Sequence, residues 1–576
     1  MKFELLKTCC LVLPLALLPA CAFSEKRHAM EADEHSLIDP SVTQVAVSEA
    51  EIDPDLMFHI LVGEIASQRG SDELSLDYYM EAARSSQDLK IVERATRLAV
   101  TAGDYEKAEE AVRFWVKLSP TDADARLVMA SVHVRKGEIE SAREQLETLL
   151  KLVGDDRKGF DLIVRALGRE PDKANLLKTV SLLVEPRQDD PNAVHAYTVL
   201  AMHANDMQLA TKSVQRLIKL APERDDVWVI YARIMLVVGR SQQAVEVMRP
   251  IVQDGSPGKL LRITYARLLL NARLNREAKA QFDEILKIDP SNPDVLYSVA
   301  LLAINSHQDE EAKGYLLKLV NLNFHENAAS YYLGQIAERS KDYEGALAWY
   351  AGVSQGNFAV DAGVRLAILI GKQGNITKAR SQLESLREAH PDRVLPIYLA
   401  EGALLRNEAF YQEAIALYTL ALEKFAGNSD LLYSRSLVAE KLNDLSMAES
   451  DLRAIILSEP NNASALNALG YTLADRTDRY EEALDLIRRA FKIKPLDPAI
   501  IDSMGWIQYR LGNLEEGLKY LREAFAKFAD PEIASHLGEV LWHLGNKDEA
   551  QKVWSDSLQK NPEHPVLKKV IEKFKP

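Results

Sequence analysis

The 576-residue chain contains very little cysteine: its three cysteines all lie within the first 21 residues. Neither a disulfide framework nor a cysteine-rich zinc module can therefore stabilise the rest of the chain. The charge has the wrong sign for a protein that neutralises nucleic-acid phosphates, because 70 Lys and Arg stand against 85 Asp and Glu, a net charge of −15. Packing alone must stabilise the body, and nucleic acid is a poor first guess for its ligand.

Motifs of catalysis are also missing. The sequence has no zinc-protease helix motif, glycine-rich phosphate loop, nucleophile elbow or paired cysteines. His536 and His543 lie seven residues apart without an acidic third ligand, which favours a pair of surface histidines over a metal site. Asp502 and Glu539 are better interpreted as charges lining a solvated groove than as an acid–base pair. We therefore expect no enzyme, no metal and no cofactor.

The N-terminus carries an apolar run that is too short to span a membrane. Residues 9–18 supply about half of the roughly 20 apolar residues that a spanning helix requires. The run ends in Leu-Pro-Ala-Cys at residues 18–21, which resembles the bacterial lipobox, where a signal peptidase cuts before a cysteine that then receives diacylglycerol. The resemblance implies a signal peptide over residues 1–20, cleavage between Ala20 and Cys21, and lipid attachment at Cys21. The alternatives are an ordinary secreted protein cut nearby, or a cytoplasmic protein with an apolar leader.

The residues after the cysteine indicate where in the cell the protein is located. Ala22 stands where lipoproteins kept in the inner membrane typically carry Asp, so the resemblance implies the outer membrane of a Gram-negative cell, with the body facing the periplasm. Residues 22–55 contain nine acidic and two basic residues, a net charge of −7, and no sustained apolar period. We expect residues 21–55 to form the lipidated cysteine and an acidic, flexible tether. Each buried methylene of an acyl chain contributes about 0.8 kcal/mol, so lipid is the expected membrane contact.

From residue 56 the apolar residues recur three and four positions apart, a spacing typical of helices. The segments also repeat every 34 residues, the length of a tetratricopeptide repeat, a helical hairpin that buries its faces against neighbouring hairpins. Alanine recurs twelve positions after the eighth position of most units, and a bulky residue follows four positions later. The eighth positions, where the two helices of a hairpin touch, are Gly63, Thr96, Ala130, Val164, Thr198, Ala232, Ala266, Ala300, Gly334, Ala367, Gly402, Ser436, Gly470, Gly505 and Gly538.

This register predicts an all-α fold, an α-solenoid with a right-handed superhelix of about fifteen tetratricopeptide repeats over residues 56–564. A capping helix is expected over residues 565–576. The fourth unit, residues 157–190, is irregular because Leu176 replaces the small residue. Second helices are expected to end before prolines, which cannot continue a helix. These prolines are Pro120, Pro222, Pro290, Pro391, Pro460, Pro495 and Pro562.

The first helix of each unit should face a concave groove, with its second, fifth, ninth, twelfth and thirteenth residues forming the ligand surface. Arg233 and Arg267 hold consecutive ninth positions and could form paired hydrogen bonds with carboxylates of a bound chain. Groove arginines and aromatic residues are typical of binding hot spots, and the alternative is that the aromatic residues brace neighbouring helices. The predicted protein-binding residues are Arg233, Arg267, Tyr297, Tyr331, Gln335, Arg339, Tyr433, Asn467, Tyr471, Trp506, Tyr509 and Trp542.

A lipobox, an acidic tether and repeats to the C-terminus together resemble the LbcA-type outer-membrane lipoproteins, adaptors of a periplasmic carboxyl-terminal processing protease. Residues 331–338, 502–506 and 530–542 are the most telling stretches. The resemblance implies a non-enzymatic scaffold that brings the protease to its substrates, chiefly hydrolases that cut peptidoglycan cross-links. Two alternatives stay open: an assembly lipoprotein, such as a pilotin for a secretin or a polysaccharide-export scaffold, and a cell-wall enzyme or metal protein with a hidden site.

Overall fold

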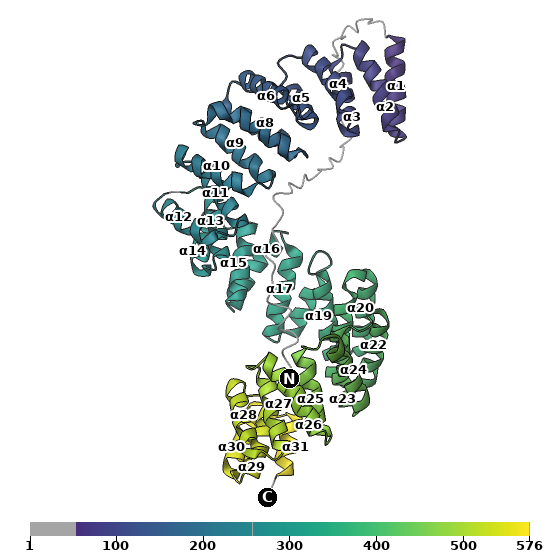
Figure 1. The fold of residues 1–576 in the computed structure, drawn as a ribbon, viewed down its shortest axis with the longest axis vertical. Coiled ribbons are helices and arrows are strands. Elements are labelled where there is room, and N and C mark those ends of the chain that lie inside the picture. Colours follow the sequence, from purple (N-terminus) through teal and green to yellow (C-terminus); the bar gives the residue numbers. More distant parts are fainter. Residues whose placement is uncertain (1–52, 256, 575–576) are drawn as a thin grey trace, which may run out of the picture. The chain divides into compact units, whose positions relative to one another are not determined.

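The computed structural model describes residues 53–255 and 257–574, and every regular element in these ranges is a helix (Figure 1). The expected signal peptide, the Ala20–Cys21 cleavage site, the lipid-bearing Cys21 and most of the tether lie outside the described residues. No helix in the described ranges combines the length and apolarity needed to cross a bilayer.

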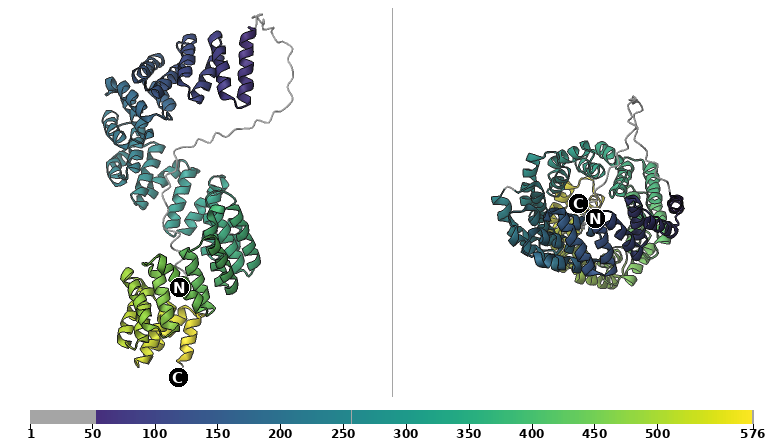
Figure 2. Two further views of the ribbon diagram at one scale, coloured as in Figure 1. Left: turned by 45° about the vertical axis from the view of Figure 1, so that its right-hand side comes forward. Right: turned by 90° about the horizontal axis from the view of Figure 1, so that it is seen from above.

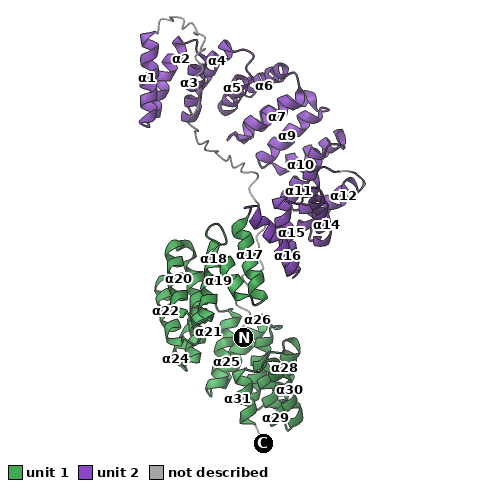
Figure 3. Ribbon diagram, turned by 180° about the vertical axis from the view of Figure 1, so that it is seen from behind, with its two compact units in different colours: residues 1–32, 325–576 green, residues 33–324 purple. Residues whose placement is uncertain are grey.

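The chain divides into two compact units, coloured separately in Figure 3. The described part of unit 2 runs from residue 53 to residue 324. Its helices are α1 (Pro54–Gln68), α2 (Asp72–Ser85), α3 (Leu89–Ala102), α4 (Tyr105–Leu118), α5 (Ala123–Lys136), α6 (Ile139–Val153), α7 (Asp156–Leu167), α8 (Lys173–Val184), η1 (Glu185–Arg187), α9 (Pro191–His203), α10 (Met207–Leu220), α11 (Asp225–Val237), α12 (Ser241–Asp254), α13 (Lys259–Asn271), α14 (Asn275–Ile288), α15 (Pro293–Asn305) and α16 (Asp309–Asn321).

The described part of unit 1 runs from residue 325 to residue 574. Its helices are α17 (Glu326–Arg339), α18 (Tyr343–Ala351), α19 (Ala359–Lys372), α20 (Ile376–Ala389), η2 (Pro391–Arg393), α21 (Val394–Asn407), α22 (Tyr411–Lys424), α23 (Ser429–Lys441), α24 (Leu445–Ser458), α25 (Ala463–Arg476), α26 (Tyr480–Ile493), α27 (Pro498–Arg510), α28 (Leu514–Lys527), α29 (Pro531–His543), α30 (Lys547–Lys560) and α31 (Pro565–Lys573).

Consecutive helices pair into hairpins that stack on their neighbours, as the two further views of Figure 2 also show. The odd-numbered helix is the first helix of each hairpin and the even-numbered helix is the second. Each second helix that precedes one of the predicted prolines ends two residues before it; α4, for example, ends at Leu118 before Pro120. The predicted all-helical stack of tetratricopeptide-like hairpins is confirmed, and the handedness of the superhelix stays a prediction.

Glycine at the eighth position makes room for a large ring in the same hairpin. A Cβ added to Gly334 would lie 2.5 Å from Cε1 of Tyr350, which is 1% exposed, and one added to Gly63 would lie 2.8 Å from Cδ2 of Tyr79. In other hairpins the residue that packs back is aliphatic: Leu316 follows Ala300, and Ile487 and Leu521 lie against Gly470 and Gly505. The bulky residue therefore packs back into its own hairpin, as predicted, and the close approach explains the small eighth residue.

The fourth hairpin differs from the others. Its helices α7 and α8 pack little against each other, whereas α7 packs on α9 and α8 packs on α6. Leu176, at the position where other units carry alanine, is fully buried. A buried leucine needs more room than the alanine of the other units, which gives a physical reason for the irregular packing of this unit.

Candidate functional site

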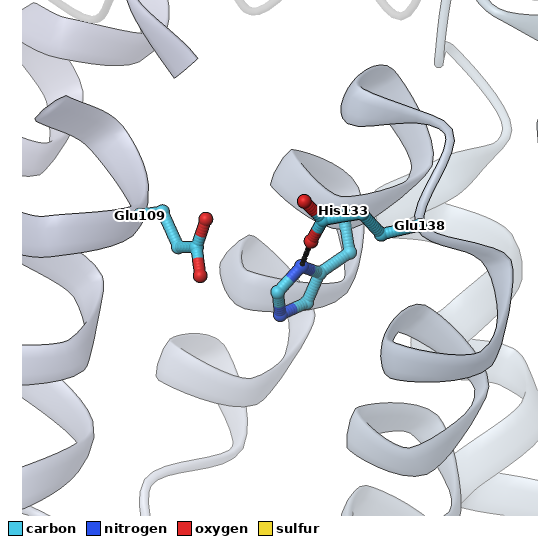
Figure 4. Close-up of side chains that lie close together, drawn as sticks. All are labelled: Glu109, His133 and Glu138. Atoms are coloured by element: carbon cyan, nitrogen blue, oxygen red, sulfur yellow. Dashed lines mark hydrogen bonds and ion pairs between the residues drawn. The ribbon is translucent and has the colours of Figure 1, made fainter. Parts of the chain in front are cut away.

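A cluster of potential metal ligands lies between the second and third hairpins. Glu109 of α4, His133 of α5 and Glu138 place one ligand atom each within 4.8 Å of one another. Figure 4 shows His133 and Glu138 pointing toward each other, joined by a bond of 2.7 Å between Nδ1 and Oε2, with Glu109 facing them. Metal-ligand geometry alone would make this a candidate cation site.

Basic side chains already neutralise this cluster. Nζ of Lys136 lies 2.5 Å from Oε2 of Glu109 and 3.2 Å from Oε1 of Glu138. Arg113 forms a further ion pair with Glu109. A metal ion would have to displace the Lys136 ammonium from Glu109 and Glu138, which is costly because Glu109 and His133 are buried. We interpret the cluster as an ion-pair network that joins two hairpins; the sequence analysis missed it because its members come from different units.

Arg233 of α11 and Arg267 of α13 are exposed, and neither makes an ion pair or hydrogen bond through its side chain within the described residues. Exposed apolar side chains hold other groove positions of the same two helices: Val237 of α11 is 50% exposed and Leu260 of α13 is 56% exposed. We call the second, fifth, ninth, twelfth and thirteenth positions of the first helices the inner face. In unit 2, this part of the inner face offers two unpaired guanidinium groups beside uncovered apolar surface.

The ninth-position arginines extend beyond the two predicted ones. Arg97 of α3 and Arg165 of α7 hold the same register position and are also exposed. Counting ninth positions over all units would have found them in the sequence. Tyr297, at a fifth position of α15, is half-buried in the same unit.

The predicted residues on α17 differ in exposure. Tyr331 is only 8% exposed, because its ring stacks on Phe358 with centroids 4.8 Å apart. Gln335 is half-buried and Arg339 is exposed. Tyr331 therefore braces neighbouring helices rather than offering a contact to a ligand. Gln335 and Arg339 stay accessible.

The C-terminal hairpins bring several predicted residues together around His536. Nδ1 of His536 lies 3.0 Å from Oδ2 of Asp502, and Nε2 lies 3.2 Å from the hydroxyl of Tyr471. The indole of Trp506 stacks on the imidazole with ring centroids 4.2 Å apart. Since His536 is 8% exposed, its interpretation as a surface histidine is wrong. The spacing of 34 residues between His536 and Asp502, one repeat, was the signal that could have revealed this contact.

The protonation of Tyr471 and His536 does not suit nucleophilic catalysis. Burial, with the nearby charges of acidic side chains, raises the pKa of the Tyr471 phenol well above its usual value, so its hydroxyl stays protonated. Burial lowers the pKa of His536, but the charge and hydrogen bond of Asp502 outweigh that effect and leave the pKa raised. A protonated phenol next to an imidazole that favours its charged form lacks the activated base and nucleophile that covalent catalysis needs. The arrangement of Tyr471, His536 and Asp502 suits binding of a partner rather than catalysis.

The remaining predicted residues surround this group. The hydroxyl of Tyr509 donates to Oε1 of Glu539 at 3.3 Å, and Tyr433 is half-buried on α23. Asn467 of α25 is half-buried, and its Oδ1 has no hydrogen-bond partner. Trp542 packs beside Trp554 with ring centroids 5.9 Å apart. Glu539 is therefore tied to neighbouring side chains, which disfavours the free acid–base pair with Asp502.

Comparison with known proteins agrees with this architecture. Tetratricopeptide-repeat models match residues 99–164, 310–357, 361–393, 433–498 and 503–565. The TPR repeat-containing protein PA4667 of Pseudomonas aeruginosa is 34% identical over 477 residues, which cover 82% of this chain and 80% of that protein. The cellulose synthase 2 operon protein C of Komagataeibacter xylinus is 23% identical over 246 residues, 42% of this chain and 17% of that protein. A solved structure, the APC/C hetero-tetramer Cut9–Hcn1, aligns over 84% of this chain and 96% of its own at 15% identity, with a TM-score of 0.30.

Proposed function

The chain belongs to the tetratricopeptide-repeat family, and we propose that it is a non-enzymatic scaffold that binds protein partners on the inner faces of its two units. Repeats of this kind expose long surfaces formed by successive hairpins, which suits extended protein ligands. The observation that carries the proposal is the pair Arg233 and Arg267, which are exposed, unpaired and set in uncovered apolar surface. Arginine in such surroundings is typical of binding hot spots.

The inner faces of the two units differ in chemistry, which favours an adaptor over a single-ligand receptor. Unit 2 offers arginines at ninth positions, whereas the C-terminal hairpins of unit 1 offer carboxylates and aromatic rings. Two faces of opposite charge select different partners, because each face repels a partner surface that carries the same charge. A chain with both faces can hold two kinds of protein at once.

We further propose where the scaffold works and what it joins. Lipid on Cys21 would hold it on the outer membrane, facing the periplasm, in agreement with the lipobox-like sequence at residues 18–21. The resemblance to LbcA-type lipoproteins supports a carboxyl-terminal processing protease and peptidoglycan hydrolases as the two kinds of partner. The protein would raise the local concentration of protease and substrate rather than perform chemistry itself.

Charge reversal tests the arginine face. The variant Arg233→Glu/Arg267→Glu should lose capture of a partner by the mature chain while remaining folded, because the two side chains are exposed and contribute little to packing. Its matched control is Lys212→Glu/Arg276→Glu, which makes the same charge change at exposed positions on second helices α10 and α14 of the same unit. Equal capture by both folded variants would contradict the assignment.

An assembly lipoprotein is the second candidate, and the likeness to cellulose synthase 2 operon protein C is the observation that favours it. In that case the same inner faces would bind components of a polysaccharide-export or secretin complex. Recovery of such components without a protease would replace the adaptor proposal.

A further inference from the structure

Four carboxylates from successive first helices gather on the inner face of the C-terminal hairpins. Glu440 lies on α23, Asp475 on α25, Asp502 on α27 and Glu532 on α29. All four act electrostatically on the phenol of Tyr471, so they lie around one point of the unit. Helices α25, α27 and α29 pack side by side, which holds the positions of Asp475, Asp502 and Glu532 together.

Two of these carboxylates are left without a counter-charge in contact. Asp502 is paired with His536, and Oδ1 of Asp475 lies 4.0 Å from Nη1 of Arg510. Glu440 and Glu532 make no side-chain hydrogen bond or ion pair among the described residues. Burial raises the pKa of Glu440 above its usual value; the charges of Glu532 and Asp475 add to this, and those of Lys441 and Arg476 oppose it. A partly buried carboxylate without a counter-charge in contact attracts a cation.

Two polar atoms without hydrogen-bond partners lie on helices that also carry these carboxylates, α25 and α27. Trp506 is 6% exposed, stacks on His536, and has a buried Nε1 donor with no hydrogen-bond partner. The Oδ1 acceptor of Asn467, on the neighbouring helix α25, is likewise unpartnered. Leaving a buried donor or acceptor unpaired is costly, so native proteins rarely do so without a reason. One donor and one acceptor together match the carbonyl and N–H of a peptide backbone.

We propose that this surface, formed by Glu440, Asp475, Glu532, Tyr471, Asn467 and Trp506, binds an extended, lysine- or arginine-bearing segment of a protein partner. The basic side chain would lie between Glu440 and Glu532, where charge-assisted hydrogen bonds form. The segment's backbone would pair with Asn467 and Trp506, and Tyr471 would offer an aromatic surface beside the cation. This inference rests on the proposed scaffold function. It adds that the partner segment bound by unit 1 is basic.

A pair of synthetic peptides tests the proposal. One is a fluorescein-labelled nonapeptide of alternating lysine and serine, and the other replaces each lysine with glutamate. Fluorescence anisotropy with the full mature chain should show binding of the lysine peptide, which weakens with added salt, and no binding of the glutamate peptide. Equal binding of both peptides, or of neither, would overturn the proposal.

Three variants locate the site. Glu440→Gln/Glu532→Gln should weaken lysine-peptide binding by about tenfold or more, because two charge-assisted contacts are lost. The control Glu481→Gln/Glu515→Gln makes the same charge change at exposed positions on second helices α26 and α28, and should bind as the unaltered chain does. Asn467→Ala changes no charge and should weaken binding about fivefold.

The outcomes also separate this inference from the proposed function. Equal binding by the Gln variant and its control would overturn the assignment of the basic segment to this face. If the unaltered chain still captures protein partners in that case, the scaffold function survives and only this inference fails. If the unaltered chain captures no protein partner at all, the proposed scaffold function itself is contradicted.

Discussion

The close packing of Gly402 of α21 against Tyr418 of α22 gives a quantitative prediction. The phenol ring is 1% exposed and lies so near Gly402 that an added Cβ would overlap its Cζ, Cε1 and hydroxyl oxygen. In Gly402→Ala the ring must leave its place, and overpacking a core costs about 1–3 kcal/mol. Alanine recovers up to about 1 kcal/mol through its higher helix propensity. We expect a net loss of up to about 2 kcal/mol in the stability of this hairpin.

Another hairpin of the chain shows which pair of residues accommodates an alanine at this position. Ala300 and Leu316 hold the same two positions in α15 and α16, and both are fully buried. In a Tyr418→Leu background, Gly402→Ala should therefore be neutral or stabilising by up to about 1 kcal/mol. Hydrogen exchange of the α21 and α22 amides measures the effect locally, since repeats open in separate units. An equal cost of Gly402→Ala in both backgrounds would refute the packing argument.

Three further predictions concern other parts of the chain. Glu401→Ala should destabilise the protein by about 3 kcal/mol, the low end for a buried ion pair, because the Glu401 carboxylate is 1% exposed and the Arg387 guanidinium that it pairs with, on a side chain 13% exposed, loses that partner; Arg380, which also pairs with Glu401, is more exposed and loses less. An unchanged urea midpoint would contradict this. The raised pKa of His536 means that its pairing with Asp502 stabilises the fold fully below the unfolded value of 6.5 and less as pH rises through the folded pKa. Above pH 6.5 the Tm should consequently fall more steeply for the unaltered chain than for Asp502→Asn, and equal slopes would count against the pairing. Cys21→Ser should release the protein from membranes, measured by fractionation, and continued sedimentation with outer membranes would exclude a purely lipid anchor.

The hairpin architecture could be predicted because it depends on a few positions that repeat. A small eighth residue such as Gly334, with a large residue sixteen positions later such as Tyr350, records helix contact directly in the sequence. The opening of the fourth hairpin was visible only as an irregular unit. Its cause, the way α7 and α8 pack on different neighbours, depends on contacts between units that the register of one unit does not contain.

The inner-face candidates were harder to predict, because register gives the direction of a side chain and not what covers it. Arg233 and Arg267 are exposed in the structure. Trp506 holds the same register position but is buried under His536, a residue that the sequence alone predicts at the surface. Polar residues at inner positions can pair across one repeat, and such pairs become visible only when neighbouring units are compared position by position.

Affinity capture from a periplasmic extract, with the mature chain carrying Cys21→Ser as bait and mass spectrometry as readout, tests the scaffold function most directly. We expect a carboxyl-terminal processing protease together with peptidoglycan hydrolases, and loss of at least one of them with the Arg233→Glu/Arg267→Glu bait. Recovery of secretin or polysaccharide-export components without the protease, or of no protein that the unaltered bait enriches, would contradict the adaptor account.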